Sequence, residues 1–342
     1  MKKVRVQDAV GMVLCHDITK IVPGEFKGVA FKKGHIIQEE DVEKLLDLGK
    51  ANIYVWESQE GQLHEDEAAI RLARAVAKNG LELTEPKEGK VNLHAAQEGL
   101  LKINVGLLEE INSIDQIVVA TLHTNQVVPK GQLVASCRVV PLVIDEEKIE
   151  QVEKICASTR GIIEIKPVKK VKAGLVTTGG EIFSGRKKDA FGPVIKAKLE
   201  NLGSELVKQV FVPDDVTKIT KAILDLKAEG MELILTTGGM SVDPDDLTPS
   251  GIRATGAKIE AYGAPVLPGS MFLLAYLDNI PILGLPGCVM YNKTTIFDLV
   301  LPRVLAGEVI TRSDLVKLGH GGLCLNCQTC TFPHCHFGKE GK

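Results

Sequence analysis

After residue 170, the spacing of hydrophobic residues changes from one segment to the next. Short runs of consecutive apolar residues alternate with longer segments in which apolar residues recur every three or four positions. The first kind is typical of buried strands and the second of amphipathic helices. The segments are VKAGLVT (171–177), GPVIKAKLENLG (192–203), ELVKQVFV (205–212), DDVTKITKAILDLKAEG (214–230) and MELILTT (231–237). This alternation of strand and helix predicts an α/β fold with a mostly parallel sheet.

The fourth of these segments is the clearest helix. Its apolar residues fall on one helical face at three- and four-residue spacing, namely Val216, Ile219, Ile223 and Leu226. Asp214 or Asp215 is a suitable N-terminal cap, and Gly230 is typical of a helix end. We therefore expect this helix to cover one face of the sheet.

Residues 1–166 show no single rhythm, so we expect a smaller α+β domain there. Strands are predicted near 4–6, 51–55, 116–122 and 132–144, and helices near 39–48, 64–79, 94–112 and 145–158. The proline-containing segment KPVKKVK (166–172) is typical of a domain boundary. We expect the α/β domain at 167–318 and, from Gly319 to the end, a Cys-rich tail that cannot bury a core of its own.

One short motif occurs twice. Thr-Thr-Gly-Gly stands at 177–180 and again at 236–239, which is 236 − 177 = 59 residues later, and each copy follows a predicted strand. Ligands of open parallel sheets bind beyond the carboxyl ends of the strands, where glycines let the backbone approach closely. The alternative is that each glycine pair only makes a tight turn. We predict one phosphate-binding site, built from Thr178, Gly179, Gly180, Gly238 and Gly239.

Acidic residues follow both turns. Glu181 and Asp189 come after the first, and Asp243, Asp245 and Asp246 come after the second. Carboxylates beside a phosphate repel it unless a cation lies between them, and Mg²⁺ is commonly held by one or two carboxylates plus substrate phosphates. A phosphorylated ligand with Mg²⁺ is therefore expected. Asp243 and Asp245 are expected to be helix caps or solvated loop residues instead.

A third loop reads Gly284-Leu285-Pro286-Gly287, at the end of a short apolar strand. An amphipathic helix is predicted directly after it, within 281–307, so that Pro286 stiffens the loop and Gly287 frees the first helical N–H groups. Cys288 would open that helix, where the helix dipole lowers the pKa of a thiol. The alternative for Cys288 is a small buried residue.

The amino-acid composition of the chain argues against several classes of function. With 342 residues, 44% of them hydrophobic, the chain can bury two cores. A formal charge of −3 and scattered Lys and Arg residues predict no nucleic-acid partner. Polar residues interrupt the N-terminal segment, and the longest apolar runs are far shorter than the roughly 20 residues that cross a bilayer. We expect a cytoplasmic homo-oligomer that does not bind a membrane.

Taken together and in this order, three stretches resemble the molybdopterin-binding domain of molybdenum-cofactor biosynthesis proteins. They are TTGGEIFSGRKKDAFG (177–192), ILTTGGMSVDPDDLTP (234–249) and GLPG (284–287). AVGMVLCHDI (9–18) is also similar to the opening of the molybdotransferase branch of that family. The residues that match the family's motifs are Glu181, Asp189, Gly238, Gly239, Ser241, Asp246, Thr248, Gly284, Pro286 and Gly287.

The resemblance implies a three-layer αβα fold and a pocket for molybdopterin or its nucleotide form. It implies Mg²⁺-dependent adenylyl transfer or molybdate insertion, a transferase activity in which Asp246, Glu181 and Asp189 would be the catalytic acids. Two residues depart from the family: Gly180 replaces an Asp, and Cys288 replaces an Asn. A small β-barrel of the molybdotransferase branch is also missing.

These departures leave two alternatives open. The first is a non-catalytic carrier that delivers the cofactor to a molybdoenzyme client. The second is an enzyme of the same fold that acts on nicotinamide nucleotides, because DDLTP (245–249) resembles that branch too. The GLPG loop and the helix expected after it favour the pterin.

The tail contains four crowded cysteines, Cys324, Cys327, Cys330 and Cys335, spaced two, two and four residues apart. In a chain without an export signal, such crowding indicates metal binding and not disulfides. Three thiols two residues apart resemble the ligand run of a [4Fe–4S] cluster, which we favour. A Zn²⁺ site completed by His320, His334 or His336 is the alternative.

Overall fold

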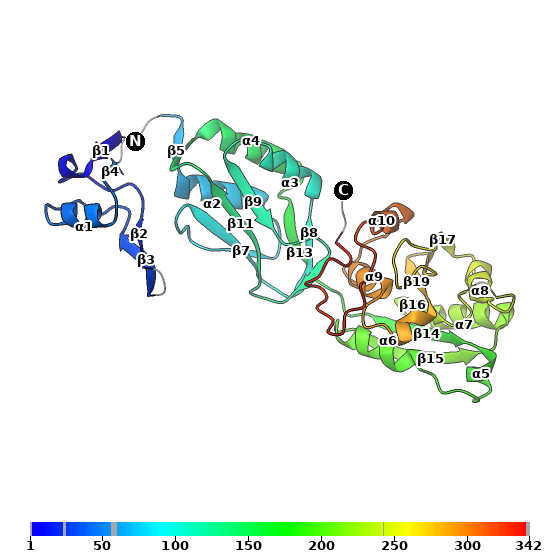
Figure 1. Cartoon of the computed structure of the whole chain (residues 1–342). Helices are drawn as coiled ribbons and strands as arrows, with labels where there is room; N and C mark the ends of the chain where they lie inside the picture. The colour runs from blue at the N-terminus through cyan, green and yellow to red at the C-terminus, as the bar shows by residue number, and fades with distance from the viewer. Residues whose placement is uncertain (1, 23–24, 56–59, 242, 340–342) are drawn as a thin grey trace. The chain divides into compact units, whose positions relative to one another are not determined.

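A computed structural model describes residues 2–22, 25–55, 60–241 and 243–339 (Figure 1). The chain divides into two compact units. The first contains residues 1–97, 102–122 and 129–165, and the second contains 98–101, 123–128 and 166–342. The main division therefore lies beside the KPVKKVK segment, and the tail groups with the second unit. Within the described ranges, no helix is both long and apolar enough to cross a membrane.

Before residue 166, short strands and helices alternate irregularly. The helices are α1 (Asp41–Asp47), α2 (Glu65–Val76), α3 (Val105–Asn112) and α4 (Glu146–Ala157). The strands are β1 (Lys2–Arg5), β2 (Ile18–Val22), β3 (Phe26–Phe31), β4 (Asn52–Val55), β5 (Gln62–His64), β6 (Leu81–Leu83), β7 (Lys90–Ala95), β8 (Gly99–Ile103), β9 (Ile117–Thr121), β10 (Gln126–Val128), β11 (Leu133–Val139), β12 (Val143–Asp145) and β13 (Ile163–Lys166). Three of the four helices expected here are confirmed as α1, α2 and α4.

The helix expected at 94–112 is wrong in its first half. Residues 99–103 form β8, which pairs antiparallel with β10, and only the second half forms α3. The side chain of Asn104 accepts a hydrogen bond from the Leu107 N–H and so marks the helix start. Strand pairing outweighed the local helix propensity of this segment.

The second unit is built on a six-stranded sheet in the order β15-β14-β16-β19-β18-β17. Its strands are β14 (Lys172–Thr178), β15 (Glu205–Val212), β16 (Leu233–Thr237), β17 (Lys258–Tyr262), β18 (Leu273–Leu277) and β19 (Ile280–Leu285). The strands β15, β14, β16 and β19 run parallel, whereas β18 is antiparallel to both of its neighbours, β19 and β17. The expected mostly parallel sheet is confirmed.

Helices cover both faces of this sheet. They are α5 (Gly180–Phe183), α6 (Phe191–Glu200), α7 (Val216–Ala228), α8 (Thr248–Ala254), α9 (Ile296–Leu305) and α10 (Arg312–Lys317). The expected helix after residue 214 is α7, with Asp215 as its cap and Gly230 at φ +82° just beyond its end. The domain is therefore a three-layer αβα sandwich.

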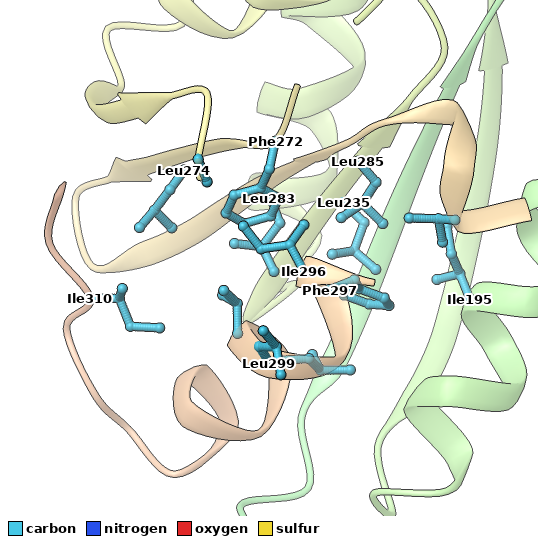
Figure 2. Packing of buried hydrophobic residues seen from close by; sticks show 14 of the residues in the cluster. Ile195, Leu235, Phe272, Leu274, Leu283, Leu285, Ile296, Phe297, Leu299 and Ile310 are labelled. Carbon is cyan, nitrogen blue, oxygen red and sulfur yellow. The ribbon is translucent and has the colours of Figure 1, made fainter. Parts of the chain in front are cut away.

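Alternate residues of the central strands face opposite helix layers, as a period of two requires. On β16, Leu235 packs with α6 and α9, whereas Ile234 packs with α7 and α8. Figure 2 shows the larger cluster, in which Phe297 of α9 lies among Leu235, Leu285 and Ile195. This packing fixes the strand ends that carry the Thr-Thr-Gly-Gly turns.

The Cys-rich tail contributes to the same core. Phe337 is 1% exposed and belongs to the cluster formed by α6, α9 and the sheet, with Phe332, Cys324 and Cys335 packed against it. We expected a tail with no buried core. Instead, one aromatic side chain anchors it, because a buried phenyl ring gains roughly 1.5–3 kcal/mol from leaving water.

Candidate ligand-binding cleft

The two Thr-Thr-Gly-Gly turns lie side by side. In the parallel pair of β14 and β16, Thr177 is the register partner of Thr237. The Thr237 hydroxyl donates a hydrogen bond to the Thr177 hydroxyl, with 3.2 Å between the oxygens. The repeated motif therefore marks two adjacent strand ends on one edge of the sheet.

The glycines of the second turn are required by the first turn. Gly238 has φ +80°, and a Cβ placed on it would lie 2.2 Å from the carbonyl oxygen of Thr178. Gly239 has φ +53°, and its Cβ would lie 2.9 Å from the Thr248 hydroxyl. The space beside Gly239 is thus filled by protein, and tight turn packing explains this glycine pair.

Gly180 differs from these two. Its φ is not in the left-handed region, and the nearest atom to a Cβ would be an Asp214 oxygen at 4.0 Å. The first turn therefore has room for a side chain at 180, although the chain carries none there.

Thr248 connects the two turns by hydrogen bonds. Its hydroxyl lies 3.1 Å from the Thr178 hydroxyl and donates to the carbonyl of Gly238 at 2.8 Å. Because a hydroxyl has one hydrogen, Thr178 must be the donor between the two hydroxyls. Thr248 is fully buried, so its contribution is to position the turns.

A cleft of about 900 Å³ opens above the turns. It is lined by Thr178, Gly179, Gly180, Glu181, Ile182, Lys187, Lys188, Ala190, Phe191, Asp214, Gly238, Gly239, Asp243, Pro244, Asp245, Asp246 and Met290. Five of these residues are acidic and two are lysines. An anionic ligand therefore needs an additional cation in the cleft to offset the carboxylates.

The acids after the second turn form a closed loop. Asp246 accepts the Asp243 N–H on a carboxylate oxygen at 2.9 Å and donates its own N–H to the Asp243 carbonyl at 2.9 Å. Tyr262 of β17 holds the start of this loop, since its hydroxyl donates to the Met240 carbonyl at 2.9 Å and lies 3.2 Å from the Ser241 carbonyl oxygen. Burial, and secondarily the charge of Asp246, raise the pKa of the Tyr262 hydroxyl. Ser241 itself is exposed and lies outside the lining of the cleft.

The two acids after the first turn have separate surroundings. Glu181 lines the cleft, with a Glu181 oxygen 3.6 Å from the Lys187 ammonium. Asp189 lies outside the cleft lining. Its oxygens accept the N–H groups of Phe191 and Gly192, both at 2.9 Å, and the Gln209 amide at 2.8 Å. This geometry makes Asp189 the residue that binds the start of α6.

Asp214 is a cleft residue that sequence reasoning assigned only a capping role. It follows β15, the strand beside β14, and its carboxylate accepts the Gly180 N–H at 2.9 Å. The signal was available, because an acid follows a third parallel strand at the same edge of the sheet. Asp214 thus places a carboxylate against the backbone of Gly180, which has no side chain of its own.

The third loop supports the turns from outside the cleft. Gly284 packs under the second turn, since a Cβ on it would lie 2.6 Å from the methyl carbon of Met240. Pro286 and Gly287 are absent from the cleft lining, whereas Met290 belongs to it. The loop therefore shapes one wall through Met290.

The helix expected within 281–307 is present as α9, but its expected start directly after this loop is wrong. Gly287–Met290 form only a short 3-10 turn, and α9 begins at Ile296, where Thr295 and Asp298 make reciprocal capping hydrogen bonds. Cys288 consequently has no α-helix N-terminus beside it. Burial raises the pKa of its thiol, contrary to the lowered value expected.

Metal-ligating groups of three do not converge anywhere in the described ranges. Mg²⁺ takes one or two protein carboxylates and completes its shell with phosphate oxygens and water. Carboxylate oxygens are the hard ligands that Mg²⁺ prefers, so the donor set fits this ion.

Comparison with known proteins agrees with this architecture. Residues 174–306 match the family described as "Probable molybdopterin binding domain", and residues 3–57 match a "Domain of unknown function (DUF8806)". The part from 174 to 306 belongs to the molybdopterin-binding domain family of molybdenum-cofactor biosynthesis proteins.

Similar curated proteins are molybdopterin molybdenumtransferases. The one from Haemophilus influenzae is 28% identical over 151 residues, which is 42% of this chain and 37% of that protein. The one from Synechococcus elongatus is 24% identical over 185 residues, 51% of this chain and 46% of that protein. The chain thus spans less than half the length of these relatives.

Among solved structures, the molybdopterin biosynthesis enzyme MoaB from Thermus thermophilus is 24% identical, with a TM-score of 0.33. The match covers 40% of this chain and 98% of that one. The tungsten cofactor synthesizing protein MoaB from Pyrococcus furiosus is 23% identical, with a TM-score of 0.30, and the match covers 35% of this chain and 84% of that one.

Proposed function

Because residues 174–306 belong to the molybdopterin-binding domain family, we propose that the cleft binds molybdopterin or its nucleotide form together with Mg²⁺. The observation that carries this proposal is the pairing of the two turns through Thr177 and Thr237, beneath a cleft rich in carboxylates. Paired strand ends present backbone to a phosphate, and the acids supply oxygen ligands to a cation.

In this proposal the residues that line the cleft have separate roles. Asp246 and Asp214 hold Mg²⁺, and Lys187 and Lys188 offset the remaining phosphate charge at the rim. Gly179 lines the cleft and has no Cβ, so its backbone can approach the phosphate, whereas the Gly180 N–H already donates to the Asp214 carboxylate. When bound, Mg²⁺ would neutralise charge on phosphate or molybdate oxygens.

The enzymatic form of the proposal is adenylyl transfer or molybdate insertion. Such reactions depend on positioning and charge stabilisation, so no protein nucleophile is required. Glu181 is the third acid in this arrangement, at the mouth of the first turn and paired with Lys187. Asp189 acts indirectly, through the start of α6.

A carrier that holds the cofactor for a molybdoenzyme is the second candidate. It is favoured by the missing side chain at Gly180, where a Cβ would meet no atom closer than 4.0 Å. The enzyme is favoured by Asp214, whose carboxylate reaches the Gly180 N–H.

The deciding experiment begins with mass spectrometry of the ligand released from anaerobically purified full-length protein. We expect a pterin carrying a phosphate or a nucleotide. The protein is then incubated with molybdopterin, ATP and Mg²⁺, and separately with molybdate, and the products are analysed. Product formation supports the enzyme, and retention of unchanged pterin supports the carrier. If no pterin is released and none binds in a fluorescence titration, the proposal is wrong.

A further inference from the structure

The four tail cysteines lie on a loop that is closed at its base. We call residues 321–338 the cysteine loop. The Gly338 N–H donates to the Gly321 carbonyl at 3.0 Å, and the His336 ring nitrogen Nε2 lies 2.8 Å from the Leu323 carbonyl oxygen. The Cys324 N–H donates to the Leu267 carbonyl at 2.8 Å, which ties the loop to the αβα domain. The loop is thus held at defined points.

None of the four thiols is in a disulfide, and they are the most exposed group of cysteines in the chain. Cys327 and Cys330 are exposed, and Cys324 and Cys335 are half-buried. By contrast, Cys15, Cys137 and Cys156 are buried. Exposed free thiols are an oxidation hazard, so two exposed and two half-buried thiols within twelve residues call for a function.

Hydrogen-bond donors already face two of the sulfur atoms. The Asn326 N–H donates to the Cys324 sulfur at 3.4 Å, and this bond is made possible by the left-handed backbone of Asn326 at φ +50°. The Thr294 hydroxyl lies 3.3 Å from the Cys330 sulfur. Donors of this kind stabilise metal-bound thiolates and tune the centre they hold.

We infer that the cysteine loop binds an iron–sulfur cluster through Cys324, Cys327, Cys330 and Cys335. Three thiols separated by two residues each can surround one corner of a [4Fe–4S] cube, and Cys335 supplies the fourth ligand after four further residues. His336 is engaged at the base of the loop through Nε2.

Cluster binding would rearrange the loop. No three ligating side chains converge within the described part of the loop, so the thiols must move together. Transfer of an assembled [4Fe–4S]²⁺ cluster from a thiolate donor is a ligand exchange: four bonds from iron to the donor's thiolates break, four iron–sulfur bonds to cysteine form, and the protons of the four cysteine thiols pass to the released thiolates. In this transfer neither the cysteine thiols nor the irons change oxidation state.

The position of the loop relates it to the cleft. Thr294, which contacts Cys330, and Lys293, whose ammonium donates to the Gln328 carbonyl at 3.2 Å, both precede α9. Met290, three residues before Lys293, lines the cleft. The segment 290–294 therefore has one end at the candidate ligand site and the other at the cysteine loop.

The test is metal analysis of the full-length chain purified without oxygen. We expect a brown protein with about four irons and four sulfides per chain and broad absorption near 400 nm. If the protein is isolated without metal, it is reconstituted with ferric iron, sulfide and dithiothreitol, which reduces two of the four irons and is itself oxidised to its disulfide. One zinc per chain with no iron would overturn the cluster, as would failure to take up iron and sulfide on reconstitution.

Single substitutions separate ligands from other thiols. Cys327→Ser and Cys330→Ser are expected to lose most of the iron, whereas the matched control Cys288→Ser, a thiol outside the loop, keeps it. Circular dichroism verifies that each variant is folded. Alkylation followed by peptide mass mapping should show the four loop thiols protected in the cluster-loaded form and modified after chelation. Equal iron content in all variants would refute the assignment.

Discussion

The Thr237 hydroxyl donates a hydrogen bond to the Thr177 hydroxyl, 3.2 Å away and 60 residues earlier in the chain. This bond joins the two copies of one motif at neighbouring strand ends. A side-chain network continues from Thr177 to Gln209, whose amide donates to the Thr177 hydroxyl at 2.9 Å and to Asp189 at 2.8 Å. One hydrogen-bond network therefore connects the first turn, the second turn and the start of α6.

The buried hydroxyl of Thr248 should contribute measurably to stability. Thr248→Val keeps the shape of the side chain but removes the donor to the Gly238 carbonyl. We expect the free energy of unfolding to fall by about 1–3 kcal/mol. Urea denaturation checks this, with Thr217→Val at an exposed position of α7 as the control, for which a change within about 0.5 kcal/mol is expected. Equal effects of the two substitutions would contradict the connecting role of Thr248.

Alanine substitutions of Gly239 and Gly180 form a matched pair of variants. Gly239→Ala places a methyl group 2.9 Å from the Thr248 hydroxyl at a positive φ and should cost at least about 1–2 kcal/mol. Gly180→Ala meets no atom closer than 4.0 Å and should change stability by less than about 0.5 kcal/mol. Thermal unfolding of both variants provides the comparison. The reverse order would show that the turns are packed differently.

Asp246 should govern the dependence of ligand affinity on Mg²⁺. Asp246→Asn retains an oxygen that can accept the Asp243 N–H, so the loop keeps its shape while one negative charge is lost. We expect the gain in pterin affinity on adding Mg²⁺ to shrink about tenfold, which corresponds to about 1.4 kcal/mol.

Calorimetry with Mg²⁺ and with EDTA measures this gain. Asp225→Asn is the control, because Asp225 is paired with Lys221 on the surface of α7, 2.6 Å away. An unchanged gain in Asp246→Asn would remove this residue from the metal site.

Stability of the first unit should fall in alkaline solution. Burial raises the pKa of the Cys156 thiol to about 11 and that of Cys137 to about 12. In the unfolded chain a thiol titrates near about 8.5. The folded state therefore binds more protons above that pH, and the stabilisation from these neutral thiols is lost as pH rises toward the folded pKa values.

Cys156→Val tests this effect because valine fills a similar space and does not titrate. The difference in unfolding free energy between the native chain and this variant should decline between pH 8.5 and 11 by up to about 1.4 kcal/mol per pKa unit. The same difference in unfolding free energy measured at pH 7 gives the effect of the substitution on packing. A difference that stays constant across this range would contradict the raised pKa of Cys156.

Much of the sheet, and the edge where the two Thr-Thr-Gly-Gly turns meet, could be predicted from the sequence. Thr177 and Thr237 could be placed together because parallel strands with the same buried pattern end at one edge of a sheet. Residues after β15 were read only as a helix cap. Asp215 does cap α7, but Asp214 beside it turns toward Gly180. The spacing of hydrophobic residues does not show which of two neighbouring acids caps the helix.

Other residues depend on long-range contacts. Gly99–Ile103 looked helical because the residues around it favour helix, yet pairing with β10 made it a strand. Cys288 was placed at a helix start because an amphipathic pattern follows, although Thr295 and Asp298 already carried a capping signal seven residues later. Phe337 gave no sign of burial, since its partners come from α6, α9 and the sheet.

The burial of Phe337 affects how the function of the cysteines can be studied. A protein shortened before Gly319 would lose the thiols and would also open a hole in the core against Leu299, next to which Gly338 packs at a distance that leaves no room for a Cβ. The newly exposed leucines would favour aggregation, and loss of pterin binding in such a fragment would reflect a damaged sandwich. Fusion partners and affinity tags likewise belong at the N-terminal end of this chain.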